Sequence, residues 1–256
     1  MIANYHTHTW RCNHASGAER QYVENALAAG LETLGFSDHS PYVFPGDYYS
    51  NFRMRLHQLE DYVETILALR KEYGNRIYIP LGLELEYYPD FLPDLLPILR
   101  DQPLDYLLLG QHFLGNEIHD HYSGWPTTDK KLLERYVNQS VEAMQTGMFT
   151  YFAHPDLMRF EGDERFYRQQ MRRICAEAKN CGMPLEINLL GLQTQRNYPN
   201  WRFWEEAASE GCAVIIGRDA HEPEALLDLE TGEKARTMAT SLGLHLIDMV
   251  PLKKIF

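Results

Sequence analysis

The sequence has 256 residues, of which 45% are hydrophobic, and a formal net charge of −12 at pH 7. This length and composition suit one domain over residues 1–256, and so acidic a chain excludes extended binding to nucleic-acid phosphates. A small anionic substrate is still compatible with this charge if its pocket is locally positive.

The N-terminal segment and the cysteines favour a cytoplasmic protein. The first ten residues, MIANYHTHTW, lack the basic and apolar regions of a signal peptide, and no stretch approaches the ~18 apolar residues of a membrane span. The four cysteines are too sparse for a disulfide scaffold, which favours reduced thiols. Cys12 lies among clustered histidines, although a free cysteine is more often a small buried hydrophobe.

Short apolar runs alternate with longer helical segments along the chain. We expect strands within 2–6, 31–37, 77–85, 105–113, 148–154, 184–190 and 212–217. We expect helices at 18–30, 55–74, 129–147, 164–182 and 200–211, each ending in a glycine that suits a C-cap. This alternation predicts an α/β fold with a parallel sheet. Seven such units without a GxGxxG fingerprint favour a barrel over an open sheet.

Histidines and acidic side chains gather where the predicted strands end. In chain order they are His6, His8, Asp38, His39, Glu84, Glu86, His112, His154, Asp156, Glu186, Asp219 and His221. The carboxyl ends of parallel barrel strands share one face, so these side chains should converge. One histidine at a strand end is usually structural, and an HxH pair alone is weak, so the prediction rests on the joint pattern.

So many imidazoles and carboxylates in one pocket need a compensating positive charge, which divalent metal ions supply. The number of candidate ligands suffices for two or three ions. Nitrogen and carboxylate ligands suit zinc, manganese or iron, and the residue types do not choose among them.

Together, the histidines and acidic residues at the predicted strand ends resemble those of the PHP family (polymerase and histidinol phosphatase). The resemblance rests on HTH at 6–8, His14, Asp38-His39, Glu84, His112, His154 and the DAH at 219–221, in that order along nearly the whole chain. The segments GLELEYYPD, GQHFLGNE, AHPDLMRF and EINLLGLQTQRNYPN are most similar to those of histidinol-phosphate phosphatases. The resemblance implies a distorted (β/α)7, TIM-like barrel in a single domain, with a trinuclear metal centre.

The resemblance also implies a ligand set for each ion. The first ion would take His6, His8, Glu84 and Asp219; the second Glu84, His112 and His154; the third His14, His39 and His221. Asp38 would orient a ligand imidazole. Arg159 and Arg196 would bind the substrate's phosphate.

The implied reaction is hydrolysis of a phosphate monoester, L-histidinol phosphate, with Glu84, Asp219 and His221 as catalytic residues. We expect a hydroxide that bridges the metals to attack phosphorus in line. Asp219 or a protonated histidine is a candidate to protonate the leaving alkoxide.

Three alternatives stay open from the sequence: a phosphatase for another small ester or phosphotyrosine, a phosphodiesterase or exonuclease, and a metal-binding module without activity. The acidic charge and the absence of a polymerase region argue against the second, and the complete ligand set argues against the third. The oligomeric state cannot be read from the sequence.

Several neighbouring residues have more than one interpretation. Arg218 either points away from the site or adds positive charge near the phosphate. Asp156, Glu186 and Asn188 are candidates to support the ligands or to bind the substrate's ammonium group, and Phe113, Tyr42 and Phe44 are candidate pocket walls. The segment 40–54 is either a lid over the site or an ordinary packed loop.

Overall fold

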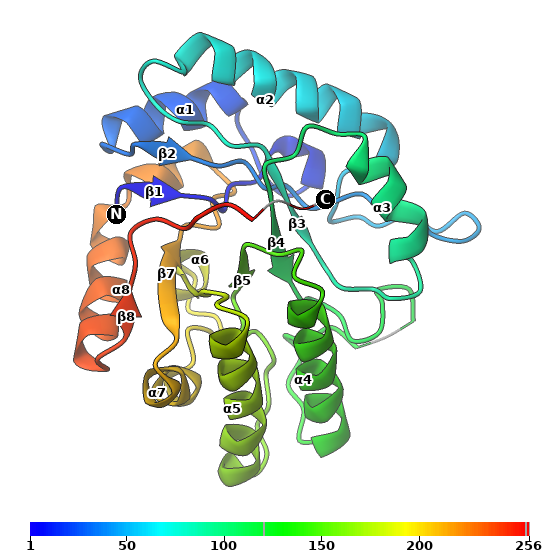
Figure 1. Cartoon of the computed structure of the whole chain (residues 1–256), viewed down its shortest axis with the longest axis vertical. Coiled ribbons are helices and arrows are strands. Elements are labelled where there is room, and N and C mark those ends of the chain that lie inside the picture. Colours follow the sequence, from blue (N-terminus) through cyan, green and yellow to red (C-terminus); the bar gives the residue numbers. More distant parts are fainter. Residues whose placement is uncertain (120, 254, 256) are drawn as a thin grey trace.

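The computed structural model describes residues 1–119, 121–253 and 255, and its helices lie around the outside of the strands (Figure 1). The strands are β1 (Ala3–Asn4), β2 (Thr33–Leu34), β3 (Gly82–Leu85), β4 (Tyr106–Gly110), β5 (Tyr151–Ala153), β6 (Leu185–Asn188), β7 (Ala213–Gly217) and β8 (His245–Leu246). The α-helices are α1 (Glu19–Ala28), α2 (Leu59–Tyr73), α3 (Leu92–Arg100), α4 (Lys130–Gln145), α5 (Glu164–Asn180), α6 (Leu189–Gln193), α7 (Trp201–Glu210) and α8 (Leu229–Ser241).

The strands form a distorted, TIM-like α/β barrel, as the sequence predicts. Strands β3 to β8 pair in chain order and in parallel, and β1 pairs in parallel with β2. Isolated bridges join the two sheets: Thr33 to Tyr78, Phe36 to Leu81 and His39 to Glu84 on one side, and Thr7 to Ala220 on the other. The ring of seven strands is therefore continued by isolated bridges at these two places, and β8 adds to the edge of β7.

Alternation along the strands separates two apolar cores. On β4, Leu107 and Leu109 pack in the large core that includes helix residues, whereas Tyr106 and Leu108 belong to a smaller cluster with Tyr5. Side chains of a strand point alternately to its two faces, so the smaller cluster occupies the barrel interior. The same alternation sends Glu84 inward, because its neighbours on β3 pack outward.

Local sequence explains where several helices begin. The side chains of Asp129, Asp163, Asn200 and Asp228 each accept a hydrogen bond from a backbone N–H in the first turn of the helix that follows. The sixth strand lies within the predicted run 184–190 and ends at Asn188. The Asn188 side chain accepts the Gly191 N–H at 3.0 Å and starts α6.

The hydrophobic pattern of the sequence did not predict α3, α6, α8 or β8. Helix α3 contains Pro97, a residue that normally ends a helix. In the part of the chain that the structure describes, none of the helices has both the length and the apolar character needed to cross a membrane.

Removing the Tyr106 hydroxyl should destabilise the barrel. This hydroxyl lies 2.6 Å from the Tyr5 carbonyl oxygen and 3.0 Å from that of Phe36, and it is fully buried. We expect Tyr106→Phe to lower the free energy of unfolding by about 1–3 kcal/mol, because buried carbonyl groups lose a donor. Urea denaturation measures this, with Tyr78→Phe as the control because Tyr78 is half exposed. Equal losses in both variants would contradict the assignment.

Candidate metal centre

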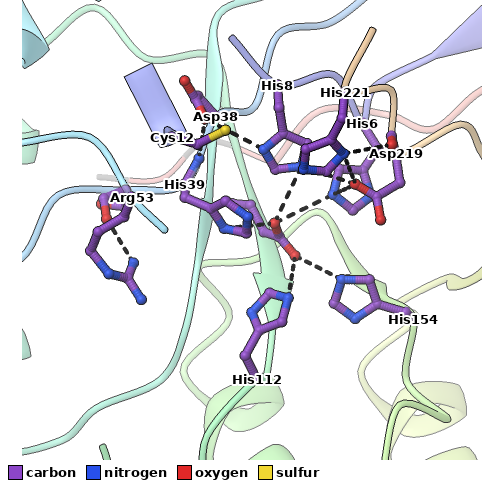
Figure 2. Close-up of polar contacts among 12 residues, drawn as sticks. His6, His8, Cys12, Asp38, His39, Arg53, His112, His154, Asp219 and His221 are labelled. Carbon is purple, nitrogen blue, oxygen red and sulfur yellow. Dashed lines mark hydrogen bonds and ion pairs between the residues drawn. The ribbon is translucent and has the colours of Figure 1, made fainter. Parts of the chain in front are cut away.

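The Glu84 carboxylate lies in the barrel interior, fully buried, with imidazoles on both of its oxygens. Figure 2 shows the rings of His39, His112 and His154 turned toward one another around this point. The rings come from different elements: the ends of β1, β4 and β5 and the segment that follows β2. The separations from Glu84 are 2.9 Å to His154 Nε2, 3.1 Å to His39 Nδ1, 3.4 Å to His6 Nε2, 3.6 Å to His8 Nε2 and 3.8 Å to His112 Nε2.

Asp219 is a second point of convergence, beyond the end of β7. Its Oδ1 lies 3.0 Å from His8 Nε2 and 3.5 Å from His6 Nε2. His221 Nε2 in turn lies 2.9 Å from His14 Nε2. The structure therefore brings all nine predicted ligand side chains together.

Several groups of these side chains have ligand atoms within 4.8 Å of one another. His14-His39-His221 is the predicted third set and His6-His8-Asp219 falls within the first. The groups His6-Glu84-His154 and His8-His39-Glu84 combine ligands of different predicted sets, so the cluster is continuous. Cys12, which is buried, forms a further such group with His8 and His221, so its sulfur also lies at the edge of this cluster.

Two candidate ligands have a backbone conformation that only the folded protein reveals. His154 has φ +34° and Asp219 has φ +51°, in the left-handed region that non-glycine residues rarely adopt. Each follows the end of its strand closely, so the turn redirects the side chain toward the cluster. Such strain persists where the surrounding structure enforces it, and it is concentrated at functional sites.

Hydrogen bonds on the outer nitrogens fix most of the rings. His6 Nδ1 lies 2.8 Å from Glu186 Oε1, and His112 Nδ1 lies 2.8 Å from Glu86 Oε1. A carboxylate accepts the Nδ1 proton in each case, which leaves Nε2 free to bind a metal. The other contacts of this kind are His8 to Asp38 at 3.4 Å, His14 to the Cys12 carbonyl at 2.8 Å and His221 to the Asp219 carbonyl at 3.0 Å.

The buried ligand atoms that have no hydrogen-bond partner suit a divalent cation. Within the described part of the chain, His6 Nε2, His8 Nε2, His39 Nδ1 and both Glu84 oxygens are buried without a hydrogen bond. Buried polar atoms without partners are costly, so a native site that concentrates them normally has a further binding partner. Imidazole nitrogen and carboxylate oxygen are the usual ligands of zinc and related ions.

Carboxylates and imidazoles shift one another's pKa values in this cluster. Burial opposes ionisation of Glu84, but His39, His6 and His112 outweigh it and hold the pKa of Glu84 well below its ordinary value. Burial lowers the pKa of His221 to about 3, which keeps this ring neutral. Burial also opposes protonation of His8, but Asp219 and Asp38 outweigh it and raise the pKa of His8 to about 9, so a cation that binds this ring displaces a proton.

A cavity of ≈ 570 Å³ opens directly onto these ligands. Arg196 lines it, and its guanidinium donates a 2.8 Å hydrogen bond to the Tyr198 hydroxyl. Arg159 does not line this cavity. It is half exposed, forms an ion pair with Glu161 at 2.7 Å, and lines a neighbouring hollow that it shares with Arg196.

Aromatic side chains make up much of the rest of the cavity wall. Phe113 lines it as predicted, but Tyr42 and Phe44 do not. Tyr42 is buried with its hydroxyl on the Glu86 carbonyl, and Phe44 packs against other aromatic rings. The aromatic wall residues that sequence reasoning missed are Phe52, Tyr122, Trp125 and Tyr198.

The side chains of Asp156, Asn188 and Arg218 have contacts that define their positions relative to the site. Asp156 accepts hydrogen bonds from the Asn200 backbone and the Trp204 indole, so it anchors the segment before α7 and does not line the cavity. Asn188 donates to Glu186 at 3.0 Å and to Asp219 at 3.1 Å. Arg218 points away from the site, since its guanidinium donates to the Asp228 carbonyl.

A parallel α/β barrel with a cluster of candidate metal ligands at the carboxyl ends of its strands is typical of one family of metal-binding proteins. A model of the PHP domain matches residues 4–189, and the chain belongs to this family.

Several proteins similar to this chain are named as histidinol-phosphatases. A "Probable histidinol-phosphatase" of Deinococcus radiodurans is 31% identical, with 87% of each chain covered. The "Histidinol-phosphatase" of Lactococcus lactis is 24% identical, covering 94% of this chain and 91% of that one. A Lactococcus lactis histidinol phosphate phosphatase structure, with zinc, L-histidinol and phosphate, superimposes with a TM-score of 0.76 at 22% identity over 99% of both chains.

A methyl group at Gly110 should displace Glu84. A Cβ there would lie 2.1 Å from Glu84 Oε1, so the carboxylate must move. We expect Gly110→Ala to bind less zinc per chain than the wild type, measured by metal analysis after dialysis. Gly232→Ala is the matched control, because the nearest atom to its Cβ would be 3.7 Å away. Normal zinc content in Gly110→Ala would argue against Glu84 as a ligand.

Proposed function

We propose that this protein is a metal-dependent phosphatase that hydrolyses L-histidinol phosphate to L-histidinol and inorganic phosphate. The observation that carries the proposal is the cavity, which six of the nine predicted ligand side chains line together with the Arg196 guanidinium: His14, His39, Glu84, His112, Asp219 and His221. A phosphate dianion would find positive charge there in an otherwise acidic protein.

Two to three divalent ions would be held by the ligand sets that the family resemblance implies, with Glu84 shared between the first two. Ions bound there supply Lewis-acid charge and lower the pKa of a bound water, which makes a nucleophile available near neutral pH. The chain's part is to fix the ligand rings through Glu186, Glu86 and Asp38.

The chain's own residues would also bind and orient the ester. Arg196 reaches the cavity and would pair with phosphate oxygens, and its hydrogen bond to Tyr198 holds the guanidinium in place. Asp219 lines the same cavity as a carboxylate, because His6, His221 and His8 hold its pKa well below the ordinary value despite its burial. Of the two candidates, a protonated histidine is therefore the one that would hand a proton to the leaving alkoxide. Arg159 would need to leave Glu161 to join Arg196 on the phosphate.

The rest of the cavity suits the organic part of histidinol phosphate. Phe52 and Phe113 stack with ring centroids 5.7 Å apart, and Tyr122 and Trp125 continue the wall. Aromatic faces attract cations and pack on flat heterocycles, so they complement an imidazole ring and an ammonium group. The named relatives point to the same substrate.

Substrate preference tests the proposal. We expect inorganic phosphate release from L-histidinol phosphate to exceed that from phosphotyrosine and p-nitrophenyl phosphate by at least about 100-fold in kcat/KM, because the named relatives are histidinol-phosphatases and a site built for one substrate discriminates on this scale. The enzyme would be purified without chelator and assayed with added zinc or manganese. Equal slow turnover of all three would leave a phosphatase with another substrate. Zinc binding without any turnover would indicate a binding module.

Arg196 should contribute to phosphate binding and not to metal binding. We expect Arg196→Ala to lower kcat/KM by about 10²–10³-fold, as removal of one charge-stabilising donor typically does, with zinc content unchanged. Arg159→Ala, assayed in parallel, tests whether that arginine leaves Glu161 for the substrate. Unchanged kcat/KM in Arg196→Ala would remove it from the site.

A further inference from the structure

Arg53 is a buried cation that the proposed reaction does not use. Its side chain is 2% exposed and lies between two buried carboxylates, Glu86 and Glu117. Arg53 Nη1 lies 3.0 Å from Glu86 Oε2 and 2.8 Å from the Ser40 carbonyl. Its Nε lies 3.0 Å from Glu117 Oε2, and Nη2 also donates to that oxygen. One guanidinium thus satisfies three acceptors in different directions.

The two oxygens of Glu86 have separate partners. Oε2 accepts from Arg53, and Oε1 accepts from His112 Nδ1 at 2.8 Å. This arrangement turns His112 Nε2 toward Glu84, which it approaches to 3.8 Å. The orientation of a candidate metal ligand is therefore set by a carboxylate whose own position is set by Arg53.

A structural ion pair alone would not require this geometry. A buried carboxylate that loses its cation is strongly disfavoured and must rotate, protonate or find another donor. A lysine has one compact ammonium group and cannot reproduce the directions of a planar guanidinium. The position of Glu86 consequently depends on the shape of the arginine as well as on its charge.

Arg53 also connects the metal centre with the cavity wall. It follows Phe52, whose ring lines the cavity, and the Arg53 guanidinium carbon lies 4.4 Å from the centre of that ring. Arg53 therefore anchors the C-terminal end of the segment 40–54, for which a lid was one interpretation. The exposed residues 45–49 of this segment come earlier in the sequence.

We propose that Arg53 is a positioning residue of the metal centre, which holds Glu86 where it orients His112 and holds Phe52 in the cavity wall. The proposal rests on the ligand set of the proposed function. It assigns no contact between Arg53 and the substrate.

The test is zinc affinity, measured by competition with a chromophoric chelator, in Arg53→Met, Arg53→Lys and Glu86→Gln. We expect Arg53→Met to lose about 10- to 100-fold in affinity for its most weakened zinc ion, as is typical when the partner that orients a ligand is lost. Arg53→Lys should also lose affinity, since it keeps the charge without the fork. Arg55→Met is the control, because Arg55 is exposed and packs over Tyr49.

A double variant separates positioning from general stability. If Arg53 acts through Glu86, adding Arg53→Met to Glu86→Gln should lower zinc affinity no further, whatever happens to the melting temperature. In ¹⁵N NMR of the wild type, the His112 Nδ1 proton should be present, and it should be lost or exchange-broadened in Arg53→Lys.

Wild-type zinc affinity in both Arg53→Met and Arg53→Lys would overturn the proposal, even if both variants were less stable. So would additive losses in the double variant. A wild-type protein that binds zinc but releases no phosphate would refute the proposed function alone, because the affinity comparison does not depend on turnover.

Discussion

The structure depends on one buried carboxylate, Glu84, placed where the imidazoles of several strand ends meet. Its charge can persist in the barrel interior only because positive or polar groups surround it. The neighbouring strand leaves room for it at Gly110, which has no side chain. Glu186 and Glu86 then orient the His6 and His112 rings, and neither of these outer carboxylates lines the cavity.

The barrel interior divides into an apolar and a polar half along the same strands. On the inward face of β4, Tyr106 and Leu108 pack in the small core, and the next inward position is Gly110 beneath Glu84. Alternation in a parallel barrel makes this division possible without interrupting the outer core. The apolar half supports the barrel while the polar half, at the carboxyl ends, is left for chemistry.

Much of this site could be predicted because it follows the chain's simplest periodicity. Strand ends share one face, so His6, His39 and Asp219 could be grouped although they are far apart in the sequence. The cavity wall could not be grouped in this way. Phe52, Tyr122 and Trp125 lie on irregular segments, where no period relates a residue's number to the direction of its side chain. Residue type alone favours Tyr42 for the wall, but its ring packs against Phe44 and Tyr88 instead.

The sequence by itself determined the alternation of strands and helices, and with it the barrel and the set of polar residues at its carboxyl face. Hydrophobic periodicity and residue type are local properties, so they can be read without coordinates. Only the tertiary structure decided that Arg196 faces the cavity while Arg159 pairs with Glu161, and that Arg53 lies between two carboxylates. An arginine side chain is long and flexible, and the partner it reaches depends on segments that meet only after folding.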